Sequence, residues 1–305
     1  MADLEPADAT DIPPPAPSTD VAGAAEASAA ADSAALTAGV VVREAAGRAE
    51  LRTVCDLFGG IWDEDPNDPA LTPLLLQALA FAGNYVSVAE ADGNLVGACV
   101  GFFGLTDGRW ELHSHITGVI SGHRGRHVGF ALKTHQRAWA LSRRIDRIGW
   151  TFDPLIRRNA TFNLCKLAVR PRRYLPDFYG PMTDGINAGD ETDRLLVEWR
   201  LTEPPVARAC AGRPREADLD SLRAAGAAVG LEADASGAPV LGDVDASTVL
   251  VAIPDDVERL RRSEQSSALA WRRGIRDVLG GLLGDGAVIT GFVRSGWYVV
   301  ERDKS

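Results

Sequence analysis

Hydrophobic residues change their spacing several times along the chain, from helical periodicity to extended runs and back, which predicts a mixed α/β fold. The run from Val40 to Val42 predicts a short strand, and residues 51–61 carry apolar side chains at helical spacing. A second helix is predicted to end near Phe81. Its start is signalled by Asp68-Pro69 and again by Thr72-Pro73, each a capping residue followed by a proline suited to the first helical turn.

The middle of the chain holds a group of predicted strands. Residues 85–89 and 95–103 flank the turn Asp92-Gly93-Asn94, which predicts two antiparallel strands. A third strand, 110–120, leads into a glycine-rich segment, 121–129, and then into an amphipathic helix. The same periodicities predict a strand at 148–152, a helix at about 159–167, and strands near Phe178 and at 195–201.

Composition divides the chain into four parts. Residues 1–38 hold hardly any large apolar side chain, so we expect a disordered Ala/Pro/Asp-rich tail. Residues 39–204 contain the predicted mixed central sheet and the helices that flank it. Residues 205–247 are rich in Ala, Gly and Asp, and we expect a linker or an irregular segment there.

The last part, residues 248–305, predicts a smaller α/β region. Its pattern indicates a strand at 249–253, a helix through 269–282, and a hairpin from 288–293 to 297–300. This order of strand, helix and hairpin repeats the order predicted for 148–201. One interpretation is therefore a half-repeat that packs on the first domain.

Charge and composition exclude several classes of protein. The net charge is −10, and the first 38 residues carry seven acids and no base, which leaves −3 for the rest of the chain. A nearly balanced domain lacks the basic face that nucleic-acid binding needs. No run approaches the roughly 20 apolar residues of a membrane helix, and the N-terminus is too acidic for a secretory signal, so we expect a cytoplasmic protein.

The glycine-rich segment is the strongest candidate for a binding site. Residues Arg124 to Gly129 follow a predicted strand and open a helix, where backbone N–H groups and the positive end of the helix dipole favour a phosphate or pyrophosphate. Arg124, Arg126 and Lys133 add positive charge, and glycine at 125 and 129 allows a ligand to approach the backbone closely. The alternative interpretation is an ordinary strand-to-helix turn with solvated arginines.

This segment, Arg124-Gly125-Arg126-His127-Val128-Gly129, resembles the Arg/Gln-x-x-Gly-x-Gly/Ala pyrophosphate loop of the GNAT superfamily of N-acyltransferases. His127 departs from the pattern, because the family usually has glycine at that position. The order of predicted elements over about residues 40–202 resembles the GNAT order as well, and Arg158-Asn159-Ala160 resembles the Asn-Ala that opens the family's next helix. The fold class that this implies is α/β, with a GNAT-like mixed central sheet flanked by helices.

The resemblance implies a substrate, a cofactor and a set of contacts. The co-substrate would be acyl-coenzyme A, either acetyl-CoA or succinyl-CoA, and the acceptor the amino group of a small molecule such as an amino acid. Cofactor contacts would come from the strand end, the loop and the next helix, at Val119, Arg124, Gly125, Arg126, His127, Val128, Gly129 and Asn159. Three stretches are similar to a little-characterised bacterial branch of predicted acyltransferases: 112–115, 150–155 and 178–180.

Candidate catalytic groups lie on the strand before the loop. Because side chains alternate along a strand, Glu111, His113 and His115 are expected on one face. An imidazole can accept the proton of an incoming amine, so His113 or His115 is the predicted base, and Glu111 could orient it. The alternative is a polar strand face without a catalytic role.

The acid that protonates the departing thiolate is not assigned by the sequence. Many GNAT members have a tyrosine in the helix after the second cleft strand, whereas this chain has Leu164 there. Tyr174 or Tyr179 could replace it from nearby loops, and Cys165 raises the alternative of a covalent mechanism. Asp153, Arg157 and Arg158 are possible acceptor contacts, with surface loop charges as the other interpretation.

Two other kinds of function compete with acyl transfer. The pairs His113-x-His115 and His123-x-x-x-His127 raise a metal site, but His123 precedes the helix and no Cys completes the set of ligands, so we predict no metal. The second alternative is a non-catalytic acyl-CoA-binding sensor or interaction module, which His127 and the missing helix tyrosine favour. We expect no nucleic-acid or membrane partner, and a homodimer is compatible with the sequence.

Overall fold

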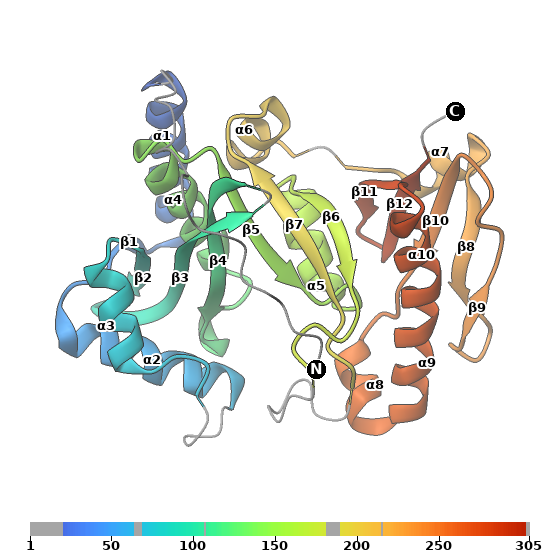
Figure 1. Cartoon of the computed structure of the whole chain (residues 1–305), viewed down its shortest axis with the longest axis horizontal. Coiled ribbons are helices and arrows are strands. Elements are labelled where there is room, and N and C mark those ends of the chain that lie inside the picture. Colours follow the sequence, from blue (N-terminus) through green and yellow to red (C-terminus); the bar gives the residue numbers. More distant parts are fainter. Residues whose placement is uncertain (1–20, 64–68, 107, 181–189, 215, 303–305) are drawn as a thin grey trace.

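The chain folds into two β-sheets that lie side by side, each packed against helices (Figure 1). The computed structural model describes residues 21–63, 69–106, 108–180, 190–214 and 216–302. Among these residues, no helix combines the length and the apolar character that crossing a membrane requires.

The first sheet has seven strands in the order β1-β2-β3-β4-β5-β7-β6. Its strands are β1 Val41–Glu44, β2 Tyr85–Ala91, β3 Asn94–Thr106, β4 Arg109–Val119, β5 Arg147–Phe152, β6 Arg170–Leu175 and β7 Arg194–Arg200. Only β4 and β5 pair in parallel, and the other neighbours are antiparallel. The predicted mixed sheet flanked by helices is confirmed.

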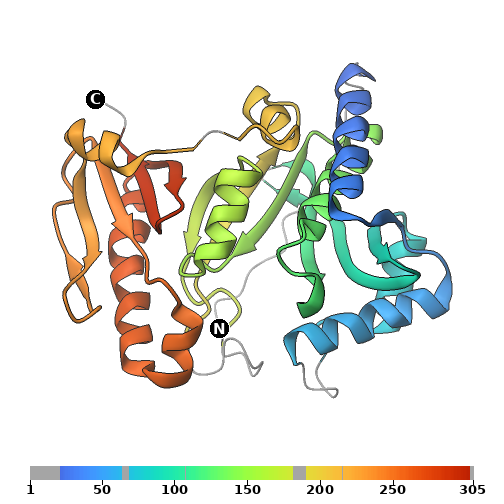
Figure 2. The same ribbon diagram turned by 180° about the vertical axis from the view of Figure 1, so that it is seen from behind.

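Helices cover both faces of this sheet (Figures 1 and 2). On one face, α2 (Gly47–Trp62) and α3 (Pro73–Phe81) pack against alternate side chains of β2 and β3. The Thr72 hydroxyl accepts a hydrogen bond from the backbone N–H of Leu75, so α3 begins at the second of the two predicted capping signals. The first signal includes Asp68, which lies outside the described residues. On the other face, α4 (Val128–Ser142) buries its apolar side.

The prediction of a disordered tail over 1–38 is wrong for residues 21–38. They form α1 (Val21–Ala38), which packs along α4, and Ala27, Ala31 and Ala34 are buried there. Glu26 of α1 also forms an ion pair with the buried Arg137 of α4, at 2.8 Å. The prediction failed because it counted large apolar side chains, whereas alanine has the highest helix propensity and its methyl group packs closely on another helix. Residues 1–20 lie outside the described part.

The position of α1 leads to a first prediction. Ala31→Glu should lower the free energy of unfolding by roughly 2 kcal/mol, because an unpaired carboxylate would have to enter the buried contact with α4. Ala29→Glu, on the exposed side of the same helix, should leave stability nearly unchanged. Urea denaturation followed by circular dichroism measures both. Equal stability of the two variants would contradict the packing of α1.

The second sheet has five strands in the order β11-β12-β10-β8-β9. Its strands are β8 Ala228–Ala233, β9 Pro239–Leu241, β10 Thr248–Ala252, β11 Val288–Val293 and β12 Trp297–Glu301. Helices α6 Pro204–Cys210 and α7 Leu219–Ala224 precede it, and α8 Val257–Ser263, α9 Gln265–Ile275, the π-helical turn η3 Arg276–Gly280 and α10 Gly281–Gly284 follow β10.

The expected linker at 205–247 needs correction, because this segment forms α7, β8 and β9 and contributes most of α6. Strand β8 pairs in parallel with β10 and is therefore an inner strand of the second sheet. The sequence signal was weak because β8 and β9 are short and β8 contains Gly230, at the point where its register shifts.

The second sheet repeats part of the pairing order of the first. In the first sheet, β5 pairs with β7 and β7 with β6; in the second, β10 pairs with β12 and β12 with β11. In both cases a helical segment with a π-helical turn, η2 (Thr161–Lys166) or η3, separates the first strand from the hairpin. The interpretation of the C-terminal region as a half-repeat stays a prediction, and this shared order is what it requires.

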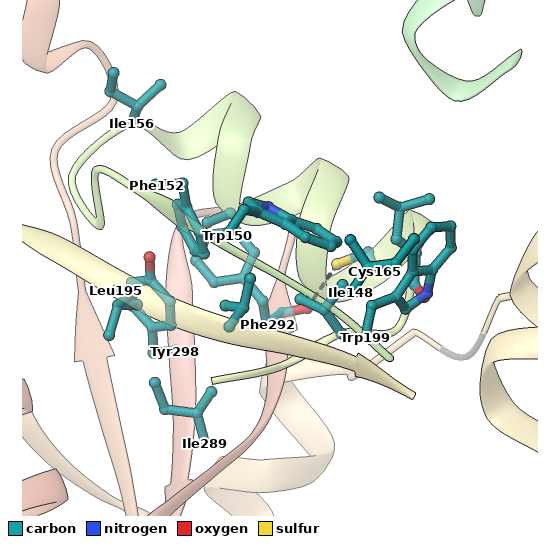
Figure 3. Close-up of a cluster of buried hydrophobic side chains, with 14 of the residues drawn as sticks. Ile148, Trp150, Phe152, Ile156, Cys165, Leu195, Trp199, Ile289, Phe292 and Tyr298 are labelled. Atoms are coloured by element: carbon teal, nitrogen blue, oxygen red, sulfur yellow. Dashed lines mark hydrogen bonds between the residues drawn. The ribbon is translucent and has the colours of Figure 1, made fainter. Parts of the chain in front are cut away.

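Both sheets contribute to one hydrophobic core. Figure 3 shows Trp150, Phe152 and Trp199 of the first sheet close to Phe292 and Tyr298 of the second. The Tyr298 hydroxyl donates a hydrogen bond to the carbonyl oxygen of Pro154, at 2.7 Å. Because these contacts are buried, the second sheet supports the end of β5, which is one edge of the candidate site.

The predicted strand near Phe178 is wrong. The strand that pairs with β7 is β6, which ends at Leu175, and residues 177–180 form a turn in which the N–H of Gly180 donates to the carbonyl of Asp177. The extended run before it contains Pro171 and three arginines, and this polar composition concealed the edge strand.

Candidate active site

Strands β4 and β5 separate soon after they meet. They pair in parallel only at Leu112 with Ile148 and at His113 with Gly149, although both strands continue beyond these pairs. After His113 and Gly149, the two strands therefore no longer pair with each other through backbone hydrogen bonds. The opening can accept an extended ligand that hydrogen-bonds to strand edges.

The glycine-rich loop lies directly after β4 and before α4. Residues Ser121–His123 form the short 3₁₀ helix η1, and Gly125 has a φ of 80°. His127, at the N-cap of α4, has a φ of 64° and a ψ of 7°, which is the left-handed region, and its side chain makes no capping hydrogen bond. The first backbone N–H groups of a helix have no intrahelical acceptor, so those of α4 are available to an anion.

The left-handed backbone of His127 explains how the loop tolerates its departure from the glycine pattern. Glycine adopts a positive φ without steric cost, and histidine is one of the other residues found there more often than most. His127 therefore adopts the backbone conformation that a glycine would adopt at this position, and its side chain is exposed.

Residues of the predicted cofactor set surround the start of α4. Arg124 and Arg126 are exposed, Val128 is buried, and the Arg124 Nε donates a long hydrogen bond of 3.4 Å to the carbonyl of Val119. A Cβ atom added to Gly129 would meet only the Val119 side chain, at 3.9 Å. A methyl group at position 129 would therefore meet no steric conflict. Asn159 lies apart from the loop, in the first turn of α5 (Arg157–Ala160) after β5.

Lys133 does not add charge to the loop, contrary to the sequence interpretation. It lies on the side of α4 that faces the sheet, and it is only 3 % exposed. Its Nζ donates hydrogen bonds to the Ser114 Oγ and the Gln136 Oε1. The sequence did not reveal that the Lys133 side chain points towards the sheet, because a lysine in an amphipathic helix is usually exposed.

The two histidines of β4 lie together on the sheet face opposite α4. Their ring centroids are 6.0 Å apart, and both rings contact Phe102 of β3. The pairing of β3 with β4 shifts between Val100 and Gly101, which leaves His115 as an extra residue in β4. Residues two apart in a strand share a face, so the two rings lie together, and the bulge locally changes the alternation that follows.

Burial lowers the pKa of His113 to about 4, with the charges of His115 and Lys133 as further causes. Burial also lowers the pKa of His115, which is more exposed. At neutral pH the His113 imidazole is therefore uncharged, and a ring nitrogen can accept a proton.

Glu111 lies against β5 and not against an imidazole. Its Oε1 accepts a 2.6 Å hydrogen bond from the Thr106 hydroxyl, and a Cβ atom on Gly149 would be 3.0 Å from the same oxygen. Among the described residues, no hydrogen bond joins Glu111 to His113 or His115. The carboxylate therefore lies beside Gly149 of β5, and the expectation that Glu111 orients an imidazole is wrong.

Neither Tyr174 nor Cys165 is free to act on a thioester. The Tyr174 hydroxyl donates to the Asp193 carboxylate at 2.6 Å, and burial together with Asp193 raises its pKa well above the usual range. The Cys165 thiol donates to the carbonyl of Phe292, and burial raises its pKa to about 11. Tyr179 is half exposed, and its hydroxyl lies 3.3 Å from the Thr151 Oγ1, on the same sheet face as His113.

The three residues considered as acceptor contacts instead join the two parts of the chain. Asp153 is buried and forms ion pairs with Arg261 and Arg272 of the C-terminal region. Arg157 donates to the carbonyl of Arg294 and to Asp255, and Arg158 pairs with Glu258. Their charges are satisfied by this interface.

The described residues contain no group of three His, Cys, Asp or Glu side chains close enough to hold a metal ion. The pair His113 and His115 lacks a third ligand among them.

Comparisons with known proteins find similarity in solved structures. No protein-family model matches the chain, and no curated protein matches it. An N-acetyltransferase from Staphylococcus aureus Mu50 aligns with a TM-score of 0.44 and 14% identity, over 53% of this chain and 99% of that one. An aminoglycoside 6'-acetyltransferase type Ii aligns with a TM-score of 0.42 and 18% identity, over 54% of this chain and 99% of that one. A GNAT family acetyltransferase from Elizabethkingia anophelis with acetyl-CoA bound aligns with a TM-score of 0.41 and 12% identity, over 53% of this chain and 98% of that one.

Proposed function

We propose that this chain transfers an acyl group from acyl-coenzyme A to an amine. The observation that carries the proposal is the position of the two binding features, since the opening between β4 and β5 begins on the strand that leads into the glycine-rich loop. A ligand with a phosphate at one end and an extended chain at the other fits both. Acyl-coenzyme A has this construction.

The loop is proposed to hold the pyrophosphate. The N–H groups at the start of α4 and the positive end of the helix dipole favour a negative group, and Arg124 and Arg126 add charge. The acyl chain would enter the opening between β4 and β5, where strand-edge groups can hydrogen-bond to its amides. This assigns binding roles to Val119, to residues 124–129 and, from the next helix, to Asn159.

The chemistry proposed at the cleft is direct attack of the amine nitrogen on the thioester carbon. The attacking nitrogen becomes positively charged and strongly acidic, so a weak base can take its proton. His113 is uncharged at neutral pH and lies at the last β4–β5 pair, which makes it the preferred base, with His115 as its neighbour. Glu111 supplies a negative charge beside the same opening, which favours an incoming ammonium.

The proposed acceptor is a small-molecule amine, of the amino-acid kind. Structures with similar folds also include Arabidopsis thaliana Naa50 in complex with the bisubstrate analogue CoA-Ac-MVNAL, at 16% identity and a TM-score of 0.40, so an amine screen should include a peptide. Acetyl-CoA is the first donor to test, and succinyl-CoA the second.

The test of this function is release of free thiol from acetyl-CoA when a mixture of L-amino acids, spermidine and a short peptide is supplied. We expect amine-dependent release, and we expect His113→Phe to lower kcat by about 100-fold, the size of a lost general base. The KM for acetyl-CoA should change little, because His113 is not in the loop. His115→Phe is the matched comparison, and the variant with the larger loss identifies the base.

A binding measurement separates transfer from sensing. Calorimetry that detects acetyl-CoA binding, combined with no thiol release for any amine or either donor, would replace the enzyme with the acyl-CoA sensor. No binding of either thioester would reject both functions.

A further inference from the structure

Lys133 is a buried cation to which the described residues supply no counter-ion. Its Nζ lies 2.9 Å from the Ser114 Oγ and 2.5 Å from the Gln136 Oε1, and both acceptors are uncharged. The third side of the ammonium faces the ring of Trp150, whose centroid is 3.8 Å away. Among the described residues, no carboxylate forms an ion pair with it.

Two other buried cations, both arginines, form ion pairs. Arg137, on the same helix, is 1 % exposed and binds Glu26, and Arg272 is fully buried and binds Asp153 and Asp190. An unpaired buried ammonium is costly, because the charged form loses its hydration without gaining an opposite charge. Such a cost persists where the group has a functional role.

The position of Lys133 indicates the role. Ser114 is the first β4 residue after the last β4–β5 pair, and Trp150 is the first such residue of β5. The ammonium therefore lies between the two strands where their pairing ends, on the sheet face that α4 covers. His113 lies next to the same point on the opposite face, so the opening has a neutral imidazole on one side and an ammonium on the other.

We propose that Lys133 is the acid that protonates the coenzyme A thiolate as it leaves. This inference rests on the acyl transfer proposed above and adds the residue that the sequence left unassigned. The supporting geometry is an uncompensated ammonium at the end of the β4–β5 pairing, held by Ser114 and Gln136. The Gln136 Nε2 has no partner among the described residues, which is consistent with an amide turned to present its oxygen to the ammonium.

The proposed step is balanced in atoms and protons. The amine nitrogen forms a bond to the carbonyl carbon and gives one proton to His113, and the carbon–sulfur bond breaks as Lys133 gives one proton to sulfur. The products are the amide and free coenzyme A thiol. Protonated His113 then loses one proton to water, and neutral Lys133 takes up one proton from water, so both residues return to their first states.

The acidity of Lys133 suits this transfer. Burial lowers its pKa to about 8, and the nearby Cys99 opposes this shift. An ordinary cysteine thiol has a pKa of about 8.5, so the ammonium and a thiol are closely matched. The titratable groups around Lys133 are Cys99 of β3, whose own pKa is raised by burial, and His113 of β4. Strands β5 and β7 present Trp150 and Trp199.

The test compares two acyl donors in wild type and Lys133→Met. With acetyl-CoA and the fastest amine of the screen, the substitution should lower kcat by about 100-fold, a typical contribution of general acid catalysis. With S-phenyl thioacetate, whose aromatic thiolate leaves without help, the two proteins should react at similar rates. Wild-type kcat should fall as pH rises through about 8, and this fall should be absent in Lys133→Met.

Two controls separate chemistry from folding. Acetyl-CoA binding by calorimetry should be retained in Lys133→Met, since the loop is unchanged. Arg137→Met removes another buried cation of α4 and should lower the melting temperature while leaving kcat of the folded protein unchanged. Lys133→Arg keeps the charge but cannot release a proton near neutral pH, so it should be as slow as Lys133→Met.

Three results would overturn the inference. Equal kcat of wild type and Lys133→Met on acetyl-CoA would remove Lys133 from the reaction while leaving acyl transfer intact. Full activity of Lys133→Arg would mean that charge alone matters. Absence of thiol release by the wild type would instead reject acyl transfer itself, together with the role of Lys133.

Discussion

Gly129→Glu is expected to weaken acetyl-CoA binding by about 100-fold. The new carboxylate would stand over the first turn of α4, where the N–H groups and the helix dipole are proposed to bind the pyrophosphate. A 100-fold change is about 2.8 kcal/mol, which lies within the range expected for the loss of one or two hydrogen bonds to a charged group at about 1.5–3 kcal/mol each. Isothermal titration calorimetry with acetyl-CoA measures the dissociation constants directly.

Gly129→Ala is the matched control. The added methyl group would meet only Val119, at 3.9 Å, so the backbone and the stability should not change, and binding should remain close to that of the wild type. Arg124→Ala removes one exposed charge from the loop and should weaken binding by less than Gly129→Glu. Unchanged affinity in Gly129→Glu, with the fold intact, would move the phosphate site away from α4.

The strand, loop and helix around the candidate site could be predicted from the sequence because they depend on local order. Strand, glycine-rich loop and helix follow one another directly. The first backbone N–H groups of a helix have no intrahelical acceptor in any fold, so this feature depends only on where the helix begins. The left-handed backbone of His127 could not be predicted from its identity, since histidine adopts both signs of φ. The sign of this φ angle is set by the turn that joins η1 to α4.

Long-range contacts were the part that the sequence concealed. Lys133 occupies a helical position that is normally solvated, and its burial follows from the separation of β4 and β5, which no local pattern encodes. Asp153, Arg157 and Arg158 looked like ligand contacts because they are charged and follow a strand. Their partners are more than 90 residues further along the chain and could not be inferred without the fold.

The C-terminal region acts on the site through β5. Tyr298 and Phe292 pack behind β5, and the Asp153 carboxylate, directly after this strand, is held by two arginines of α8 and α9. The opening between β4 and β5 can keep its shape only if the free end of β5 is supported. The buried contacts of the C-terminal region therefore hold the end of β5 in place.

Asp153→Ala is expected to lower the free energy of unfolding by about 3–5 kcal/mol, the cost of leaving buried cations without their carboxylate. The side chain of Asp153 is 4 % exposed, and its Oδ2 lies 2.5 Å from Arg261 and 2.9 Å from Arg272. Asp255→Ala is the comparison, because Asp255 is 91 % exposed in its pair with Arg157 and should change stability little. Chemical denaturation of both variants measures the difference.

The same ion pairs predict how stability depends on pH. Burial alone would raise the pKa of Asp153, but Arg272 and Arg261 outweigh it and hold this pKa well below its usual range. A carboxylate whose folded pKa is depressed stabilises the protein above its unfolded pKa, near 3.9, and this contribution is lost as the pH falls further. Wild type should therefore lose more stability than Asp153→Ala between pH 5 and about 2. Parallel stability curves would show that the pKa of Asp153 does not differ between the folded and the unfolded protein, and the support of β5 would then have to come from the apolar contacts of Phe292 and Tyr298.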